Sequence, residues 1–561
     1  NSTEQNRRHV GYYILEHPLG GARKENRAGK LYFCLIGVLT LLLFGICAYF
    51  TGLFSLLLLL PAGELAKKLS DALFLHLLPP DHIPRLELKD GIPDEGRTLC
   101  VISALLTKPE DGRDYAKKLE EYYLSNRRAG KNLLFGLLAD LRDSDRPKAK
   151  GDSEIMSYAS DAISMLNRKY GNIFFLFSRP RVLSKTEGRY IAHERKRGAL
   201  CELTVLLRGR RSPLSVACGA PEALTNTKYV ITLDADTRPG VGTLARLTGA
   251  MLHPLNRPVV DMHSRTVVSG HALLQPRIAT DLPSASRSLF SRVFAGLGGI
   301  DPYSSSSSDL YQDLFGQGSF SGKGIFDVEV FDLCLTDRFP EERILSHDLL
   351  EGCFLRSGLI SNLEFTDGFP YKARSWFDRN HRWVRGDWQA GSFLFCRDLS
   401  LLSRWKLLDN LLRSLVPVFQ FSAFFAGVIL SDTPLAVLSL VSVLSPVLFA
   451  GEGILRSRGR ELGQRTHSAV LHGFRGAAIQ SVFFICFMPF QAWNCINAVS
   501  VALWRMTVSK KHLLSWVTAA ESDALPGSIS GCYARMCFAP VSGAVFISLP
   551  ELPALRLLGL L

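Results

Sequence analysis

The sequence predicts an α/β domain with a mostly parallel sheet, placed between transmembrane helices. Long uncharged apolar blocks near both ends of the chain predict the transmembrane helices. A charge-rich region between the blocks alternates short apolar runs with helical patterns, which is typical of a sheet covered by helices on both faces. Aspartates follow two of these apolar runs, at the edge where parallel sheets bind their ligands. The first two observations predict the architecture, and the third predicts where a functional site lies.

The apolar residues are gathered in four blocks. They make up 47% of the 561 residues, and the mean hydropathy of +0.12 is high for a soluble protein. The first block, 31–62, holds no charged residue and exceeds the roughly 20 residues that cross a bilayer. The others cover 415–430, 435–451 and 476–504, and polar residues in the last suit either a span or a kinked interfacial helix.

Basic residues flank these blocks and predict their orientation. They cluster before residue 31, in the loop after residue 451 and just after residue 504. Because loops rich in Lys and Arg stay on the cytoplasmic side, we expect these segments and the large soluble domain to be cytoplasmic. The net charge of +13 therefore indicates topology and contact with anionic lipid. It does not indicate nucleic-acid binding, for which the basic residues would form one stripe.

A cytoplasmic domain requires an even number of crossings before it. We expect a transmembrane hairpin over 31–78. The alternative is one span followed by a membrane-surface helix, since Glu64, Lys67 and Lys68 would lie in the second crossing. The predicted segments are a cytoplasmic N-terminal segment at 1–30, the hairpin at 31–78, the soluble domain at 79–413, a second transmembrane hairpin at 414–451, a basic cytoplasmic loop at 452–475, and membrane or interfacial helices at 476–561.

Strands and helices alternate through the first half of the soluble domain. Strands are predicted at 97–107, 132–141, 172–179 and 228–237, with helices at 114–126 and 154–171 between them. Asp140 and Asp143 end the second strand, and Asp234 and Asp236 end the fourth. Since parallel strands end at one edge of a sheet, we expect the two acidic tips to face the same crevice.

Asp234 and Asp236 form a DxD pair on the turn that ends a buried strand. A hard divalent cation that keeps waters and shares a substrate diphosphate needs only one or two protein carboxylates. The pair therefore predicts a Mg²⁺ or Mn²⁺ site. A solvated turn is the alternative interpretation, because a lone DxD is a weak motif.

Two motifs further along the chain complete the predicted site. Asp348, at a predicted helix start, is the candidate general base, with a simple helix N-terminal carboxylate as the alternative. The stretch "DRNHRWVRGDWQ" contains Arg379, Arg382 and Trp383. Guanidinium groups match phosphate oxygens and an indole ring matches a sugar face, although such a cluster also occurs in membrane-interface belts.

The order of these motifs resembles a known family. Asp140, the DxD pair, Asp348 and the element from Arg379 to Trp383 follow the D, DxD, D, (Q/R)xxRW order of processive, inverting, membrane-embedded glycosyltransferases of the GT-A fold, such as cellulose synthase. The stretches "PRLELKDGIPDEGRTL", "HERKRGALCEL" and "RILSHDLLEGCFLRSGL" are similar to the transferase part of cyclic β-1,2-glucan synthases. The similarity covers nearly the whole chain, so it is far more specific than a lone DxD.

The resemblance implies a function and a role for each residue. It implies transfer of glucose from UDP-glucose, with inversion, to a growing β-1,2-glucan chain at the bacterial inner membrane. The implied roles are uridine contact by Asp140, Mg²⁺ or Mn²⁺ binding by Asp234 and Asp236, general base catalysis by Asp348, donor binding by Lys196, Arg197, Arg379 and Arg382, and contact with both donor and acceptor by Trp383. Arg379 stands where the wider family has glutamine, so its role is the least defined.

The resemblance also implies parts and intermediates beyond this site. Full synthases of this family carry a glycoside-phosphorylase-like domain that controls chain length, so we expect this chain to be a piece of a longer protein. Tyr303, in the stretch "DPYSSSSSDLYQDLFG", is the candidate for carrying the first glucose, with an ordinary surface loop as the alternative. The competing functions are synthesis of another β-glucan linkage and an inactive scaffold. The presence of all four aspartates counts against the scaffold.

Overall fold

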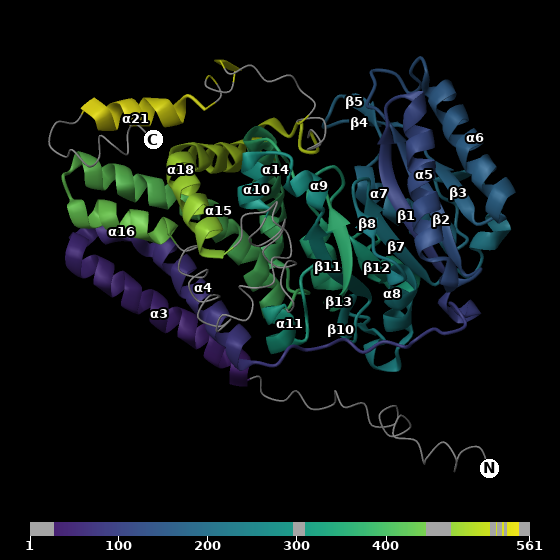
Figure 1. Ribbon diagram of the computed structural model, residues 1–561, viewed down its shortest axis with the longest axis horizontal. Helices are drawn as coiled ribbons and strands as arrows, with labels where there is room; N and C mark the ends of the chain where they lie inside the picture. The colour runs from purple at the N-terminus through teal and green to yellow at the C-terminus, as the bar shows by residue number, and fades with distance from the viewer. Residues whose placement is uncertain are drawn as a thin grey trace, which may run out of the picture.

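The computed structural model has two parts that lie side by side, an α/β domain and a bundle of apolar helices (Figure 1). It describes residues 27–295, 309–444 and 473–515, and near the carboxyl end residues 523, 530, 531, 534 and 536–548. Along the chain, two apolar helices come first, the α/β domain follows, and the remaining apolar helices come last. The α/β domain is therefore an insertion between elements of the helical bundle.

The described part of the α/β domain is built on one nine-stranded sheet. Its strands are β1 Thr98–Leu106, β2 Leu133–Leu141, β3 Phe174–Ser178, β6 Ser215–Cys218, β7 Tyr229–Asp234, β8 Arg238–Pro239, β11 Leu273–Thr280, β12 Gly324–Asp327 and β13 Ser357–Asp367. They lie in the order β6-β3-β2-β1-β7-β12-β11-β13-β8. Strands β6, β8 and β12 run against the other six. The predicted fold class, a mostly parallel α/β sheet between apolar helices of membrane-spanning length, is confirmed.

Helices cover both faces of the sheet. Cys100 and Ile102 of β1 face one hydrophobic core, and their neighbours Leu99 and Val101 face the other. Helices α5 Pro109–Ser125, α6 Asp152–Tyr170 and α8 Thr243–Leu252 complete the first core, while α7 Arg195–Leu207, α12 Val328–Leu335 and α13 Asp348–Phe354 complete the second. Strands buried on both faces are nearly continuous apolar runs, which is why the sequence predicted β1, β2, β3 and β7.

Two β-ribbons and several further helices complete the described part of the α/β domain. They are the ribbons β4 Val182–Ser184 with β5 Arg189–Ile191 and β9 Val259–Asp261 with β10 Thr266–Ser269, and the helices α9 Leu282–Ala285, α10 Leu289–Phe294, α11 Leu310–Phe315 and α14 Ala373–Ala390. In Figure 1, α14 and α10 stand between the sheet and the apolar helices. Helix α14 packs along the last long apolar helix, so it links the two parts.

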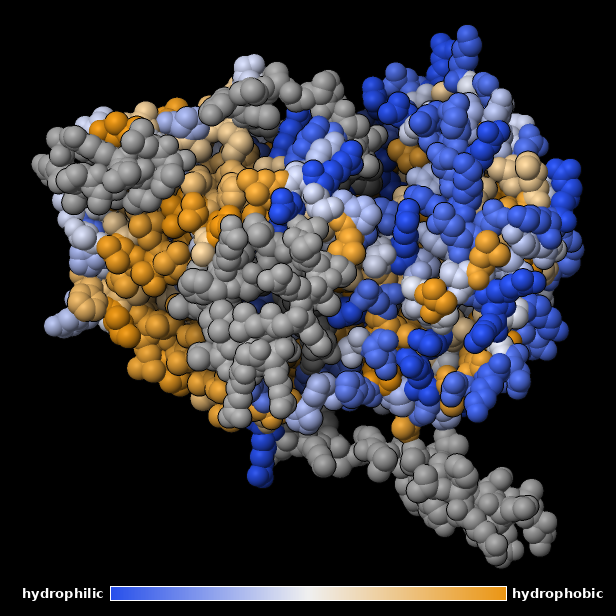
Figure 2. Space-filling model, viewed as in Figure 1, coloured by the Kyte–Doolittle hydropathy of each residue, from blue (hydrophilic) through white to orange (hydrophobic). Residues whose placement is uncertain are grey.

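The apolar helices are α3 Arg27–Thr51, α4 Leu59–Leu77, α15 Leu401–Ile429, α16 Thr433–Val443, α18 Gly473–Trp504 and α21 Phe538–Ser548. Three described segments are long and apolar enough to cross a membrane, at Arg27–Leu77, Leu401–Ile429 and Ala478–Ser509. Figure 2 shows hydrophobic side chains gathered over this side of the molecule, and polar ones over the α/β domain. The third predicted block, 435–451, is described only as far as residue 444.

The first apolar block folds as a helical hairpin. Helix α3 turns through a short 3-10 segment, Gly52–Leu58, and α4 returns along it. The Tyr32 hydroxyl on α3 donates a hydrogen bond to Asp71 on α4 across 2.6 Å. Lys67 is one of the three charged residues in the predicted second crossing, and its ammonium lies 3.4 Å from the Asp409 carboxylate on α15. That the hairpin crosses a membrane twice stays a prediction.

A buried lysine joins the bundle to the α/β domain. The Lys406 ammonium of α15 donates to the carbonyls of Gln317 and Gly318, at 3.2 and 2.7 Å. Its side chain is fully buried. The two carbonyls belong to the loop between α11 and β12, which continues directly into Gly322 and Lys323 at the edge of the sheet.

Candidate active site

Several carboxylates meet at the carboxyl edge of the sheet. Asp234 is the last residue of β7, Asp236 follows in the turn, and Asp140 lies one residue before the end of β2. The register pairs Asp234 with Ser103 of β1, and Asp140 with Leu105 of the same strand. Asp367 ends β13, which runs in the same direction. The strand order thus gathers acidic ends from distant parts of the chain at one edge.

Two lysines clamp the Asp234 carboxylate. The Lys196 ammonium, from α7, lies 2.5 Å from Oδ1, and the Lys323 ammonium lies 3.2 Å from Oδ2. Burial by itself would raise the pKa of Asp234, but the two ammonium groups outweigh it and hold that pKa well below its usual range. Asp234 is therefore a firmly ionised carboxylate at the centre of the edge.

Asp236 lies in a more acidic environment. Its side chain is exposed to solvent. The surrounding protein nevertheless partly desolvates its carboxylate, and the Asp367 carboxylate acts on it electrostatically. Burial, and then repulsion by Asp367, raise the pKa of Asp236 to about 6. Asp367 is itself held by Lys323 and by the Thr237 hydroxyl, which donates across 2.6 Å. Lys323 is thus the common counter-ion of three carboxylates.

Asp348 lies against the loop between α11 and β12, which carries Gly322 and Lys323. It begins α13, as the sequence predicts, and its carboxylate packs against Gly322 so closely that a methyl group there would stand 2.7 Å from Oδ1. Gly322 has a φ of +88°, a conformation that side chains rarely adopt. Its carbonyl also accepts a hydrogen bond from Lys196, at 2.8 Å. Asp348 and Asp234 therefore flank one lysine and one tight loop.

Helix α14 adds two half-buried arginines and an exposed tryptophan. Arg379, Arg382 and Trp383 lie three and four residues apart, hence on one helix face, and the Arg379 guanidinium stacks 4.8 Å from the Trp383 ring. Burial and the neighbouring Arg382 lower the pKa of Arg379 to about 10, against the attraction of Asp236 and Asp367. Nε of Arg379 is buried and has no hydrogen-bond partner among the described residues. This face therefore carries a guanidinium N–H, that of Arg379 Nε, which no described carboxylate accepts.

The remaining predicted donor-binding residues lie apart from this cluster. Arg179, directly after β3, binds both oxygens of Asp140, at 2.7 and 2.9 Å, so a uridine contact by Asp140 would share that carboxylate. Arg197 follows Lys196 on α7 but points elsewhere, pairing with Glu194 at 2.5 Å. Tyr303 lies outside the described residues. The roles of these residues stay predictions.

Sequence reasoning missed Lys323, Asp367 and Arg179. Arg179 carried a usable signal, because it follows a predicted parallel strand just as Asp140 ends the neighbouring one. Lys323 and Asp367 carried no such signal. Lys323 directly precedes β12, which runs antiparallel to its neighbours, and Asp367 ends β13, more than a hundred residues after β7.

Comparison with known proteins gives one strong match. The chain is 38% identical over 507 residues to the cyclic beta-(1,2)-glucan synthase NdvB of Rhizobium meliloti (strain 1021). The chain is a relative of the cyclic β-(1,2)-glucan synthases. The match covers 88% of this chain but only 18% of that synthase, so the chain corresponds to one segment of it. No protein-family model matches.

A solved structure with low similarity to this chain is also found. It is the mannosyltransferase PcManGT from Pyrobaculum calidifontis in complex with GDP-Man and Mn²⁺, 11% identical, covering 82% of this chain and 99% of that one with a TM-score of 0.38. A likeness this weak supports no inference about the site.

The donor set at the edge fits a hard divalent cation. Asp234, Asp236 and Asp367 supply carboxylate oxygens, the ligands that Mg²⁺ and Mn²⁺ prefer. The DxD carboxylates differ in what surrounds them, because Asp234 is held by two lysines while Asp236 faces another carboxylate. A cation beside Asp236 would relieve that repulsion. These residues could accordingly hold a metal that also binds a diphosphate.

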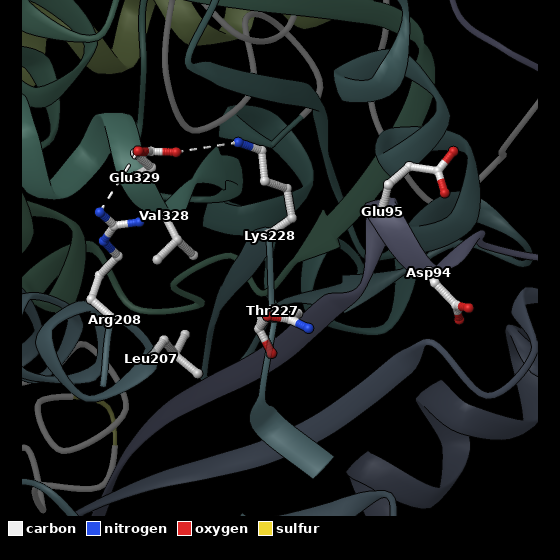
Figure 3. A pocket seen from close by; sticks show the side chains of 9 residues that line it. Asp94, Glu95, Leu207, Arg208, Thr227, Lys228, Val328 and Glu329 are labelled. Atoms are coloured by element: carbon white, nitrogen blue, oxygen red, sulfur yellow. Dashed lines mark ion pairs between the residues drawn. The ribbon is translucent and has the colours of Figure 1, made fainter. Parts of the chain in front are cut away.

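A described cavity lies at the opposite edge of the sheet (Figure 3). It encloses about 630 Å³ and is lined by Asp94, Glu95, Leu207, Arg208, Asn226, Thr227, Lys228, Val328 and Glu329. Asp94 and Glu95 in its lining precede β1, and Thr227 and Lys228 precede β7, so the cavity lies at the amino ends of these strands. Glu329 is paired with Arg208 and Lys228, at 3.7 and 3.8 Å. Because it lies at the amino ends of the strands, away from the DxD turn at their carboxyl ends, this cavity is not the candidate active site.

Proposed function

We propose that this chain is the glucosyltransferase segment of a cyclic β-1,2-glucan synthase, transferring glucose from UDP-glucose to a growing β-1,2-glucan chain with inversion. The observation that carries the proposal is the convergence of Asp234, Asp348 and Lys196 around the Gly322 loop, within a chain related to such a synthase. A metal-type carboxylate and a base-type carboxylate on opposite sides of one loop are the two groups that inverting transfer from a nucleotide sugar requires.

Each group has a part in the reaction. Asp348 accepts the proton of the acceptor hydroxyl as that oxygen bonds to C1 of glucose, and the C1–O bond to UDP breaks on the opposite face. UDP gains negative charge as it leaves, and the cationic side chains Lys196, Arg379 and Arg382 stabilise that charge where it develops. A bound Mg²⁺ or Mn²⁺ held by the DxD carboxylates would supply further charge stabilisation on the diphosphate. The unpartnered Nε of Arg379 supports an anionic ligand beside α14.

The surroundings of the site support a membrane enzyme. Lys406 and α14 tie the catalytic edge to the apolar helices. We propose a multi-pass protein of the bacterial inner membrane with the α/β domain in the cytoplasm, where UDP-glucose is available. The growing glucan and the bilayer are its partners, together with a glycoside-phosphorylase-like domain elsewhere in the longer protein. Tyr303 is proposed to carry the first glucose.

A direct assay tests the proposal. Membranes that hold this chain are incubated with radiolabelled UDP-glucose and Mg²⁺ or Mn²⁺, beside membranes that hold Asp348→Asn, and the linkage of any product is determined. We expect metal-dependent β-1,2-glucan from the native chain and a loss of at least a hundredfold in the variant, since general base catalysis contributes about 10²–10⁴-fold.

The possible results separate the alternatives. Product with β-1,3 or β-1,4 linkages would overturn the linkage, and equal product from both chains would remove Asp348 from the mechanism. Absence of product from the chain in its full-length protein would favour an inactive scaffold. The matched control is Asp378→Asn, a carboxylate on α14 that pairs with Arg374 at 3.9 Å.

A further inference from the structure

A buried histidine lies behind the proposed base. His347 immediately precedes α13, and its Nδ1 stands 2.7 Å from Oε1 of Glu351 and 3.6 Å from Oδ1 of Asp348. The side chains of His347 and Glu351 are 11% and 3% exposed, whereas that of Asp348 is 33% exposed. The imidazole thus bridges a carboxylate that solvent cannot reach and the carboxylate that faces the reaction.

The charges around this histidine leave Glu351 in need of a cation. Arg197 on α7 approaches the same region but forms its ion pair with Glu194. The charged groups that face His347 are therefore Glu351 and Asp348 from α13 and Arg197 from α7. Asp348 in turn faces Arg382 of α14. An ionised carboxylate as deeply buried as Glu351 is costly unless it is paired.

The protonation of the histidine follows from these neighbours. Burial alone would lower the pKa of His347, and Arg197 acts in the same sense. Glu351 and Asp348 outweigh both and raise that pKa above its ordinary value. The imidazolium form of His347 satisfies Glu351 directly and leaves Asp348 with a positive neighbour.

We propose that His347 is a positioning residue, which neutralises the buried Glu351 carboxylate and turns its charged ring toward Asp348, so that Asp348 stays ionised and fixed in place as the base. The inference rests on the proposed function, because it assigns Asp348 to proton abstraction. His347 itself has no contact with the reacting atoms and acts through Asp348.

The pH dependence of kcat/KM tests the proposal. His347→Gln removes the cation and leaves Glu351 without its partner, so Asp348 loses its positive neighbour and the acidic limb of the profile is expected to move to higher pH, by about one unit. His347→Gln/Glu351→Gln removes both charges, so the acidic limb returns toward its native position. The single variant is expected to lose activity at pH values below its shifted acidic limb and to regain that activity at pH values above it.

Two further measurements separate this role from simple packing. Cys353→Ala, a buried change on the same helix, is expected to leave the acidic limb where it is. The ¹⁵N signals of the His347 ring, identified by their absence in His347→Gln, are expected to show imidazolium at pH 7.5 in the native protein. This spectrum needs no catalytic turnover, so it reports on His347 even where the glucosyl transfer assay fails.

Defined results would overturn the proposal. An acidic limb that does not move in His347→Gln, or moves equally in Cys353→Ala, would assign His347 to packing alone. A double variant shifted further than the single one would show that Glu351 is not the charge that His347 neutralises. A neutral imidazole at pH 7.5 would remove the proposed charge altogether.

Discussion

At the scale of single residues, Lys323 connects the carboxylates of the candidate site. Its ammonium contacts Asp234 and Asp367 and lowers the electrostatic cost of placing Asp236 beside them. The Lys323 side chain is 11% exposed and that of Asp367 only 2%. Three acidic residues can share one edge of the sheet because this lysine and Lys196 offset their charge.

Removing that charge should destabilise the fold. We expect Lys323→Met to lower the free energy of unfolding by about 3–5 kcal/mol, because it leaves Asp367 as a buried charge without its cation. Thermal unfolding in detergent, with and without UDP, measures the effect. The control is Lys117→Met at an exposed pair with Asp114, expected to cost about 0–1 kcal/mol.

A second variant checks the cause. Lys323→Met/Asp367→Asn removes both members of the pair, so it should recover part of the lost stability. If the double variant is less stable than the single one, the loss arises from packing around the aliphatic chain and not from the unpaired charge.

At the scale of elements, the four parallel strands of the first half were predictable and the second half of the sheet was not. Strands β1, β2, β3 and β7 are long apolar runs that end in polar residues, so their pattern fixes both their type and their carboxyl ends. Strand β12 has only four residues and lies antiparallel between β7 and β11. So short a run has no period, and its neighbours are fixed by tertiary packing alone.

The same distinction applies to the site. Asp140, Asp234, Asp236 and Asp348 stand next to recognisable strand or helix ends, and the structure places each of them there. Their partners Arg179, Lys323 and Asp367 come from loops and strands whose position depends on long-range pairing. The sequence therefore predicted these four acids and Lys196, whereas three-dimensional contact was needed to find Asp367 and the further cations Arg179 and Lys323.

The loop between α11 and β12 sets the distance between Asp348 and its surroundings. Gly322→Ala would place a methyl group 2.7 Å from Asp348 Oδ1, so the carboxylate must move. We expect kcat to fall by about tenfold or more, because displacing a catalytic group by about 1 Å can cost up to 10²-fold. The measurement is glucosyl transfer at saturating UDP-glucose.

Gly188→Ala is the matched control for this change. Gly188 also has a positive φ, of +69°, but a methyl group there would meet no atom within 4 Å. It shares the backbone strain without the contact. Equal losses in the two variants would assign the effect to strain and would argue against a tight fit between Gly322 and Asp348.

At the scale of the whole molecule, the polar α/β domain and the apolar bundle divide the surface between them (Figure 2). The proposed topology puts the turn of the α3–α4 hairpin and the α/β domain on opposite sides of the membrane. Leu53 in that turn and Val241 in the α/β domain are both 80% exposed, so they form a matched pair of labelling sites.

Cysteine labelling tests this topology. In a background with the exposed Cys34 and Cys537 replaced by serine, a membrane-impermeant maleimide applied to intact spheroplasts should label Leu53→Cys and spare Val241→Cys. Inside-out vesicles should give the reverse pattern, because the sites exchange sides. Labelling of both positions from one side would contradict two crossings that place the domain in the cytoplasm.

The hydrogen bonds from Lys406 to the carbonyls of Gln317 and Gly318 make the α/β domain and the helical bundle hard to separate. A soluble fragment cut before α15 would keep every carboxylate of the edge, yet it would lose the tether of the loop that carries Gly322 and Lys323. The helical bundle therefore helps to hold the candidate site in place, because Lys406 of α15 fixes the loop that leads into it.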